Sequence, residues 1–341
     1  MIISTRRYPI HLSRGSLNRV GQLVSPRGRV FVVTATALCE LGERVARSFD
    51  PPATVITMDD GEANKTLATA ERIVTELLEH NAKRDSMVVA VGGGVVGDTA
   101  GFAAAMFLRG IDLVQVPTTL LAQVDSAYGG KVGVNHPKGK NLIGAFHPPR
   151  AVVVDPDVLR SLPDRELRSG MFEALKGGVL GDAALFELFE QHRDAIDQII
   201  ERAVRVKTAI VDSDEREKDL RRLLNYGHTI AHGIEAAMQY QGITHGEAVG
   251  WGMIGANEIA VRRGLLSDRD RTRIDRTIRA WEPAPVPADI DRAAILAATE
   301  HDKKNTGSMR VMVLPTGIGT CDIVEGISEA EIAAGIEAAL G

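Results

Sequence analysis

The sequence has few cysteines, few aromatic residues and no long apolar run. Its 341 residues include two cysteines, Cys39 and Cys321, and aromatic residues make up 4% of the chain. Two cysteines so far apart form neither a disulfide framework nor a paired-cysteine metal site, so we predict a reducing compartment and a cytoplasmic location. No segment approaches the length of a membrane span, and the start MIISTRRYPIHL lacks the apolar stretch of a signal peptide. We therefore expect no membrane association.

A strong excess of one charge is also missing. The formal net charge is −5, and charged residues make up 25% of the chain. This balance gives no electrostatic basis for binding nucleic acid. The hydrophobic content of 44% is ordinary for a globular protein, and a chain of 341 residues is expected to form two domains.

The two halves of the chain differ in their hydrophobic pattern. The first half has short apolar runs at 29–35, 53–58, 86–91, 112–117 and 151–156, with an amphipathic helical pattern at 66–81. Strands that alternate with helices predict an α/β nucleotide-binding domain with a parallel sheet, at residues 1–156.

The second half is helix-periodic at 164–180, 194–214, 219–238, 245–264 and 267–281, with one candidate strand at 310–316. We therefore predict an all-α domain at residues 157–341. A ligand is expected in the cleft between the two domains, because pockets form preferentially at such places.

A glycine-rich turn follows the third apolar run. In VVAVGGGVVGDTAGF, the glycines 92–94 directly follow a predicted strand, and Gly97 and Asp98 open a helix. Glycines let the backbone approach a ligand, and a helix N-terminus offers free N–H groups to a phosphate. The spacing is not GxGxxG, so a merely tight turn is the alternative. A nucleotide diphosphate remains the better fit, because three successive glycines cost conformational entropy.

Polar residues gather in a glycine-rich segment of the first domain, where AYGGKVGVN predicts a tight hairpin and HPKGKN a loop. These polar residues are Asp125, Lys131, Lys138, Lys140 and Asn141. Lysines and an amide that follow a parallel strand suit an anionic small molecule. Lysines in loops are often only solvated, but here their neighbours are apolar residues or glycine.

The second domain contains the candidate metal ligands. Glu173 and Lys176 stand three apart among apolar residues, which indicates a buried ion pair that is costly unless it has a task. His228 and His232 stand four apart and share a helix face, and His245 opens the next helical pattern. A carboxylate and two histidines suit an open zinc site. Spacing alone nominates His228 and His232, although an isolated HxxxH is more often not a metal site.

Taken in order, the motifs identify a known family. The chain resembles the dehydroquinate synthases within the wider sugar phosphate cyclases, through GGGVVGDTAGF, RGIDLVQVPTTLLAQVDSAYGGKVGVN, GKNLIGAFHPP, EALK, RRLLNYGHT, HGEAV and HDKKNTG. The resemblance implies that Glu173, His228 and His245 hold Zn²⁺ or Co²⁺, and that His232 contacts substrate instead. It also implies catalytic NAD, in a carbon–oxygen lyase that forms 3-dehydroquinate and phosphate from a heptulosonate phosphate. The expected steps are oxidation, phosphate elimination, reduction, ring opening and aldol closure.

The resemblance assigns the remaining site residues. The implied catalytic and substrate-contacting residues are Asp125, Lys131, Lys176, Asn141, Lys207, Arg221, Asn225, His232, Arg109 and one of Lys303 or Lys304, with Lys304 preferred. The implied NAD contacts are Glu62, Lys65, Gly92, Gly93, Gly94, Gly97, Asp98, Thr118, Thr119, Asp125, Lys131 and Lys140. Arg109 matches a residue that reaches the neighbouring subunit's site, which implies a homodimer.

The sequence leaves two alternatives open. An aminodehydroquinate synthase or another sugar phosphate cyclase shares the metal and NAD sites. A metal-dependent alcohol or glycerol dehydrogenase has a similar architecture, but GGGVVGD and Glu173 argue against it. Ala35 and Ala37 stand where the family usually has an acidic or amide residue, which leaves one ribose contact of NAD in doubt.

Overall fold

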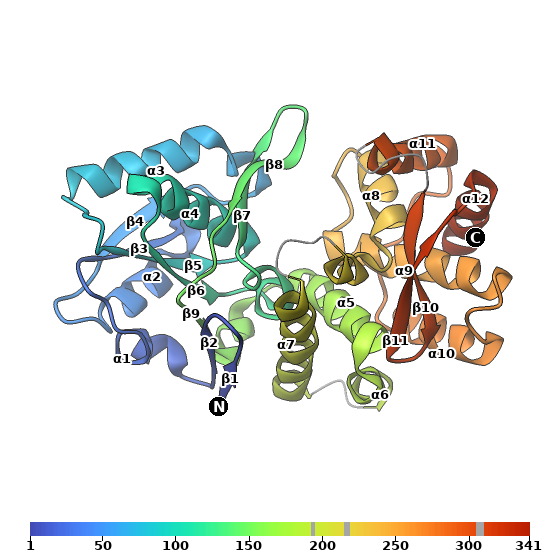
Figure 1. Cartoon of the computed structure of the whole chain (residues 1–341), viewed down its shortest axis with the longest axis horizontal. Helices are drawn as coiled ribbons and strands as arrows, with labels where there is room; N and C mark the ends of the chain where they lie inside the picture. Colours follow the sequence, from blue (N-terminus) through green and yellow to red (C-terminus); the bar gives the residue numbers. More distant parts are fainter. Residues whose placement is uncertain (192–194, 215–218, 305–309) are drawn as a thin grey trace. The chain divides into compact units, whose positions relative to one another are not determined.

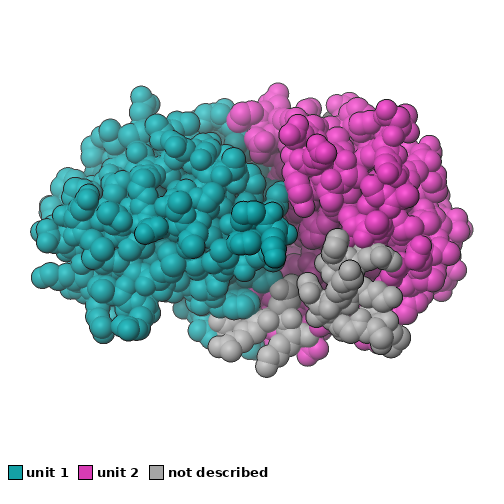
Figure 2. Space-filling view, turned by 90° about the horizontal axis from the view of Figure 1, so that it is seen from above, with its two compact units in different colours: residues 1–162 teal, residues 163–341 magenta. Residues whose placement is uncertain are grey.

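The computed structural model describes residues 1–191, 195–214, 219–304 and 310–341, and only the backbone of residues 300–304. The chain forms two compact units, Met1–Leu162 (unit 1) and Pro163–Gly341 (unit 2), which Figure 2 shows in separate colours. The predicted boundary after residue 156 falls within the 3-10 helix η6 (Pro156–Ser161), close to the end of unit 1.

Unit 1 is built on a seven-stranded sheet with the order β1-β2-β9-β6-β5-β3-β4 (Figure 1). Every neighbouring pair is parallel except β1 and β2 at one edge, so the predicted parallel sheet is confirmed. The strands are β1 (Ile2–Ser4), β2 (Pro9–Leu12), β3 (Val30–Ala35), β4 (Thr54–Met58), β5 (Met87–Gly92), β6 (Asp112–Pro117) and β9 (Ala151–Val154).

Helices cover both faces of this sheet because alternate side chains of its central strands point to opposite sides. Phe31 and Val33 of β3 pack in the cluster with α3 and α4, whereas Val30 and Val32 pack in the cluster with α1 and α2. The helical elements are η1 (Ser16–Arg19), α1 (Val20–Leu23), η2 (Thr36–Leu38), α2 (Cys39–Ala46), η3 (Glu62–Asn64), α3 (Leu67–Glu79), α4 (Gly94–Met106), η4 (Phe107–Arg109) and the π-helical turn η5 (Ala122–Ser126).

A separate hairpin pairs β7 (Lys131–His136) with β8 (Gly139–Phe146). Its turn therefore lies at Pro137 and Lys138, and the predicted hairpin within AYGGKVGVN is wrong. The glycine pair in that stretch instead forms the bend that leads into β7, with positive φ at Gly129 and Gly130. The predicted loop HPKGKN contains the real turn and the start of β8.

Unit 2 is built around α9, which packs against α5, α8, α10 and α12. Its helices are α5 (Asp164–Gly181), α6 (Ala183–Gln191), α7 (Ile196–Ser213), η7 (Leu220–Asn225), α8 (His228–Ala237), α9 (His245–Arg262), α10 (Asp268–Ala280), α11 (Arg292–Lys304) and α12 (Glu329–Leu340). The predicted helical class is confirmed, and the unit also has one hairpin of β10 (Val311–Gly317) and β11 (Thr320–Glu325). Only the first of these strands was predicted.

One segment that was predicted as a single helix is divided in the structure. Residues 219–238 form not one helix but two elements, η7 and α8, separated at Tyr226 and Gly227. Tyr226 leaves the helical conformation with ψ 125°, and Gly227, with φ +81° in the left-handed region, directly precedes α8. Within the described part of the chain, no helix combines the length and apolar character needed to cross a membrane.

Candidate active site

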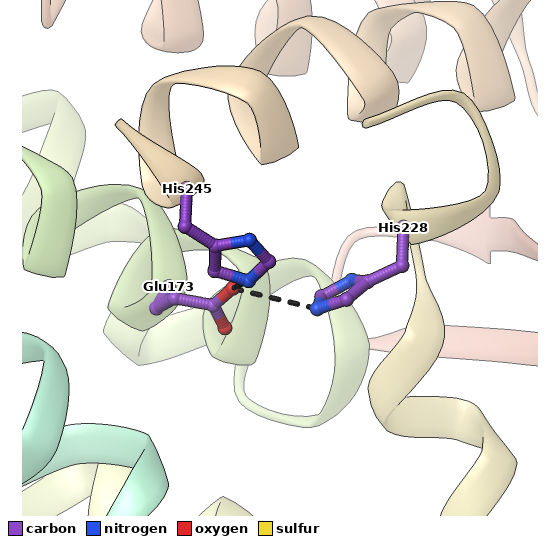
Figure 3. A group of neighbouring side chains, drawn as sticks. All are labelled: Glu173, His228 and His245. Atoms are coloured by element: carbon purple, nitrogen blue, oxygen red, sulfur yellow. Dashed lines mark ion pairs between the residues drawn. The ribbon is translucent and has the colours of Figure 1, made fainter. Parts of the chain in front are cut away.

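Unit 2 brings the three predicted metal ligands together (Figure 3). Glu173 lies in the buried stretch of α5, whereas His228 and His245 are the first residues of α8 and α9. One ligand atom from each lies within 4.8 Å of the others, and no second group of this kind occurs among the described residues. Oε1 of Glu173 lies 3.6 Å from Nε2 of His228 and 3.4 Å from Nε2 of His245.

The electrostatics of this group keep its carboxylate ionised. Burial opposes ionisation of Glu173, but the ammonium of Lys176 and the two imidazoles hold its pKa well below the ordinary value. Burial and Lys176 lower the pKa of His228. Although burial acts in the same direction on His245, its contacts with Glu173 and Glu235 raise the pKa of His245 to about 10. The carboxylates therefore draw positive charge to the space that the three side chains enclose.

The donor set fits a transition-metal ion. Both carboxylate oxygens of Glu173 are buried, and the groups that face them are the ammonium of Lys176 and the imidazoles of His228 and His245. One carboxylate and two imidazoles, with positions left for water or substrate, are suited to Zn²⁺ or Co²⁺. The residues present thus fit the metal that the sequence resemblance implied.

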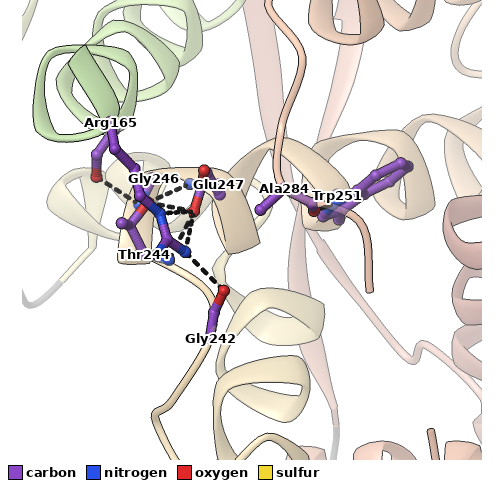
Figure 4. A network of polar contacts seen from close by, with 8 residues as sticks. Arg165, Gly242, Thr244, Gly246, Glu247, Trp251 and Ala284 are labelled. Atoms are coloured by element: carbon purple, nitrogen blue, oxygen red, sulfur yellow. Dashed lines mark hydrogen bonds and ion pairs between the residues drawn. The ribbon is translucent and has the colours of Figure 1, made fainter. Parts of the chain in front are cut away.

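Polar contacts of Thr244, Glu247 and Arg165 reinforce the start of α9 (Figure 4). They hold the end of the helix that begins at His245. Thr244 caps the helix in a reciprocal pair with Glu247, whose Oε2 lies 2.8 Å from the Thr244 backbone nitrogen. Arg165 of α5 contacts the same oxygen at 3.1 Å and the carbonyl of Gly242 at 2.6 Å. Although burial opposes this, Thr244 and Arg165 hold the pKa of Glu247 below its ordinary value. On its other side, His245 Nδ1 lies 3.3 Å from Oε2 of Glu235 on α8.

His228 is placed by the break between η7 and α8. Gly227 has φ +81°, and a Cβ there would lie 2.9 Å from Cγ of Met253. Only glycine therefore fits this turn against α9. The Nδ1 atom of His228 lies 3.1 Å from the carbonyl oxygen of Tyr226, which leaves Nε2 directed to Glu173.

Of the other predicted substrate contacts of unit 2, His232 lies beside this group. His232 is exposed on α8, and its ring centroid lies 5.5 Å from that of His228 and 6.2 Å from that of His245. It is not part of the metal group. Lys207 on α7 and Arg221 on η7 are buried, whereas Asn225 is exposed at the end of η7. The side chains of Lys303 and Lys304 lie outside the described residues.

Unit 1 brings together three of the predicted NAD and substrate contacts. Nζ of the buried Lys65 lies 2.6 Å from Oδ2 of Asp98 and 2.5 Å from Oδ1 of Asn141. Burial raises the pKa of Asp98, and the neighbouring Lys65 opposes this rise. Beside them, Asn135 donates to Oε1 of Glu62 at 2.7 Å.

The glycine-rich turn joins β5 to α4 as predicted. Gly93 is the N-cap of α4 and provides no side-chain cap, so the helix begins without a competing acceptor for its first N–H groups. Thr118 donates its backbone N–H to the carbonyl of Gly92, and Thr119 lies beside Gly93. Asp125 lies on the π-helical turn η5, Lys131 and Lys140 are exposed on β7 and β8, and Arg109 is exposed with φ +69°.

Some residues of this site were not predicted. Glu235 and the carbonyl of Tyr226, which contact the two histidines, leave no distinct sequence pattern. The cap of α9 does leave one, because Thr244 and Glu247 have the T-x-x-E spacing of a capping box. That pattern could have located the start of α9, and His245 with it.

Comparison with known proteins identifies the family. The 3-dehydroquinate synthase N-terminal family matches residues 55–169, and its C-terminal counterpart matches residues 170–305. The chain belongs to the 3-dehydroquinate synthase family. A 3-dehydroquinate synthase from Solibacter usitatus is 42% identical over 95% of this chain and 94% of its own length. The one from Desulforamulus reducens is 40% identical over 97% of both chains.

Solved structures related to this family share the fold. The 2-epi-5-epi-valiolone synthase ValA of Streptomyces hygroscopicus, with NAD⁺ and Zn²⁺ bound, has a TM-score of 0.88 at 29% identity and covers 99% of this chain and 98% of its own. A 2-deoxy-scyllo-inosose synthase with carbaglucose-6-phosphate, NAD⁺ and Co²⁺ has a TM-score of 0.86 at 28% identity, over 98% of both chains. A glycerol dehydrogenase of Schizosaccharomyces pombe, at 16% identity and TM-score 0.71, covers 99% of this chain and 90% of its own, and shares only the fold.

Proposed function

We propose that the chain converts 3-deoxy-D-arabino-heptulosonate 7-phosphate into 3-dehydroquinate and phosphate, as a carbon–oxygen lyase. The observation that carries the proposal is the group of Glu173, His228 and His245, in a chain that is 40–42% identical to named 3-dehydroquinate synthases over nearly its whole length. A cyclase that oxidises and then reduces its own substrate needs a metal and a redox cofactor, and related solved structures contain NAD⁺ with Zn²⁺ or Co²⁺.

The chain offers a separate place for each cofactor. We assign Zn²⁺ or Co²⁺ to Glu173, His228 and His245. We assign NAD⁺ to the glycine-rich turn of unit 1 and to the group of Lys65, Asp98 and Asn141, called the Lys65 cluster. When bound, the cation would supply polarisation of substrate oxygens, and NAD⁺ would supply reversible hydride transfer.

The protein's own residues bind and orient the anionic substrate. Lys207 and Arg221 are buried cations, which suit a carboxylate and a phosphate better than solvated cations do. Lys176 holds an ammonium beside Glu173, so it can orient a substrate hydroxyl next to the metal ligands. From the family resemblance we also propose substrate contacts for Asn225 and His232, and for Asp125, Lys131, Asn141 and Lys304.

The reaction itself provides the test. We would incubate the protein with the heptulosonate phosphate, Co²⁺ or Zn²⁺ and a small amount of NAD⁺, and follow phosphate, product and NADH absorbance together. We expect phosphate and 3-dehydroquinate in equal amounts without net NADH. Net NADH would assign the protein to the dehydrogenases, and NAD⁺ binding without turnover would favour another cyclase such as the aminodehydroquinate synthases.

A matched pair of variants links the activity to the metal group. Glu173→Gln removes a ligand charge at constant size, and Glu329→Gln makes the same change on an exposed side chain of α12. We expect Glu173→Gln to abolish turnover and to weaken Co²⁺ binding by more than about 100-fold, since even outer contacts of a ligand are worth 10–100-fold. Equal Co²⁺ binding by both variants would contradict the assignment.

We also propose that the enzyme is a homodimer in which Arg109 reaches the neighbouring subunit's site. Arg109 and the exposed Leu108 both have positive φ, which is an unfavourable backbone conformation for such side chains. Apolar Leu142 and Phe146 are exposed on β8, at 63% and 48%. Light scattering coupled to size exclusion would give the mass, and a monomer would refute the proposal.

A cytoplasmic location remains a prediction from the sequence, supported by two cysteines that form no disulfide.

A further inference from the structure

The tautomer of His228 is set by a backbone carbonyl. His228 Nδ1 lies 3.1 Å from the carbonyl oxygen of Tyr226, and a carbonyl can only accept a hydrogen bond. Nδ1 therefore carries the proton, and the lone pair of Nε2 is free to bind a cation beside Glu173. The position of the Tyr226 carbonyl consequently decides where the Nε2 lone pair points.

Gly227 lies between Tyr226 and His228 and cannot by itself fix the position of the Tyr226 carbonyl. Gly227 has φ +81° and no side chain, so this backbone link is permissive. It is tightly enclosed by α9, because a Cβ added to Gly252 would lie 2.0 Å from the Gly227 carbonyl oxygen. The turn is thus confined on one side by backbone packing, and its orientation depends on how Tyr226 is held.

Tyr226 is held by hydrogen bonds that lead from its buried hydroxyl through Asn257 to Asp275 at the partly exposed side of α10. Its side chain is fully buried, and its hydroxyl lies 2.5 Å from Oδ1 of Asn257 on α9. Asn257 is also fully buried, and its Nδ2 lies 2.7 Å from Oδ1 of Asp275 on α10. Arg271 lies 3.6 Å from the other oxygen of Asp275.

The direction of these hydrogen bonds follows from Asp275. A carboxylate accepts, so the amide nitrogen of Asn257 faces Asp275 and its oxygen faces Tyr226. The Tyr226 hydroxyl must then donate. Tyr226 and Asn257 are both fully buried, so either of them that loses the other leaves a buried polar group unsatisfied.

We propose that Tyr226 is a positioning residue for the metal centre. Its hydroxyl, anchored on Asn257, fixes the carbonyl that orients His228, and thereby sets the affinity and coordination geometry of the bound cation. The inference rests on the proposed function in one respect, because it takes Glu173, His228 and His245 as the metal ligands.

The first test is Tyr226→Phe, which keeps the ring and removes only the hydroxyl. Co²⁺ alone is the probe, titrated against a competing chelator without substrate or NAD⁺, with the visible absorption of bound Co²⁺ as the second readout. Removing a contact that orients a metal-bound histidine weakens metal binding about 10–100-fold. The Tyr226 hydroxyl does not itself contact His228, so its removal should have a smaller effect. We therefore expect Co²⁺ to bind roughly threefold to tenfold more weakly, with a changed absorption spectrum.

A control variant separates positioning from stability. Thr277→Val removes another buried hydroxyl of unit 2, one that bonds within α10 to the carbonyl of Arg273 at 2.9 Å. We expect Thr277→Val to lower the unfolding temperature while Co²⁺ affinity and spectrum stay as in the wild type. If Tyr226→Phe behaves in the same way, the hydroxyl is only structural and the proposal is overturned.

A double variant removes the remaining ambiguity. Tyr226→Phe with Asn257→Leu leaves no orphaned acceptor between the two residues. Asp275 loses the amide of Asn257 but is partly exposed and keeps Arg271, so stability should return toward the wild-type value. We expect Co²⁺ binding to stay weak, because the anchor is still missing, and recovery of Co²⁺ affinity together with stability would overturn the proposal. A wild-type protein whose Co²⁺ binding does not respond to Glu173→Gln would instead refute the metal assignment in the proposed function.

Discussion

Nζ of Lys176 lies 2.5 Å from Oε2 of Glu173, one helical turn away on α5, and both side chains are at most 3% exposed. Two buried charges are stabilising only as a pair, since removing one leaves the other uncompensated. The same carboxylate faces the imidazoles of His228 and His245. Lys176 therefore stabilises the metal-free protein and repels a cation that approaches Glu173.

These two roles predict that Lys176→Met lowers the stability of the metal-free protein but raises its affinity for Co²⁺. We expect the free energy of unfolding of the metal-free protein to fall by about 3 kcal/mol, and Co²⁺ to bind more tightly because a nearby positive charge is gone. Turnover should fall at least about 100-fold, as for loss of a residue that exchanges protons or orients reacting groups. Urea unfolding in chelator, Co²⁺ titration and the phosphate assay measure the three quantities. Lys83→Met, on the surface of unit 1, is the control, and weaker Co²⁺ binding by Lys176→Met would contradict the argument.

Glu235 orients the second histidine. Its Oε2 lies 3.3 Å from Nδ1 of His245, whose Nε2 faces Glu173. Carboxylate contacts of this kind increase the basicity of a metal-bound imidazole. We expect Glu235→Gln, which keeps an acceptor without the charge, to weaken Co²⁺ binding by about tenfold. Chelator competition measures this, and an affinity within twofold of the wild type would show that His245 needs no carboxylate.

Much of the fold was predictable because its signals are local. The strands of the unit 1 sheet that were predicted are short apolar runs between turn residues, and their buried positions match that pattern. The hairpin of β7 and β8 was misplaced because β8 is mostly exposed and lacks the alternation of a half-buried strand. The break at Gly227 was missed because hydrophobic periodicity continues through it, and the packing of α9 decides the turn.

The site was only partly predictable, for a geometric reason. Helical spacing pairs His228 with His232, since both lie on α8. The structure instead groups His228 with His245, from the start of another helix, and spacing within one helix says nothing about such a contact. His245 was predicted as a metal ligand only through the resemblance to the family. The residues that orient the imidazoles, Glu235 and Tyr226, depend on tertiary packing and have no sequence signal of their own.

The Lys65 cluster predicts that cofactor and metal binding can be separated. Nζ of Lys65 is shared between Asp98 and Asn141, and Lys65→Met removes both charge-assisted contacts. Because such bonds contribute about 1.5–3 kcal/mol, we expect NAD⁺ to bind at least about tenfold more weakly. Co²⁺ affinity should be unchanged, because the metal group belongs to unit 2. Calorimetry with NAD⁺ alone tests this, again with Lys83→Met as the control, and unaltered NAD⁺ binding would remove Lys65 from the cofactor site.

The ion pair of Arg263 and Glu331 predicts a pH-dependent term in stability. Hydrogen bonds from Arg263, at 2.6 Å, and from Ser328 lower the pKa of Glu331 to about 2, from an ordinary value of 4.5. A carboxylate with a lowered folded-state pKa stabilises the fold fully above pH 4.5, and this contribution is lost as the pH falls through the folded-state value. The pair joins the end of α9 to the start of α12 near the surface, so we expect Glu331→Gln to cost only about 1 kcal/mol at pH 7.

Glutamine keeps the size of Glu331 and a polar contact with Ser328 but has no charge to titrate. The stability difference between wild type and Glu331→Gln should therefore be largest at pH 7 and should shrink as the pH falls from 4.5 toward 2. Added salt should also reduce it, because the pair is only partly buried. Urea unfolding at pH 7, 4 and 3 measures the difference. A difference that stays constant with pH would mean that the hydrogen bonds of Glu331, and not its charge, hold α12 against α9.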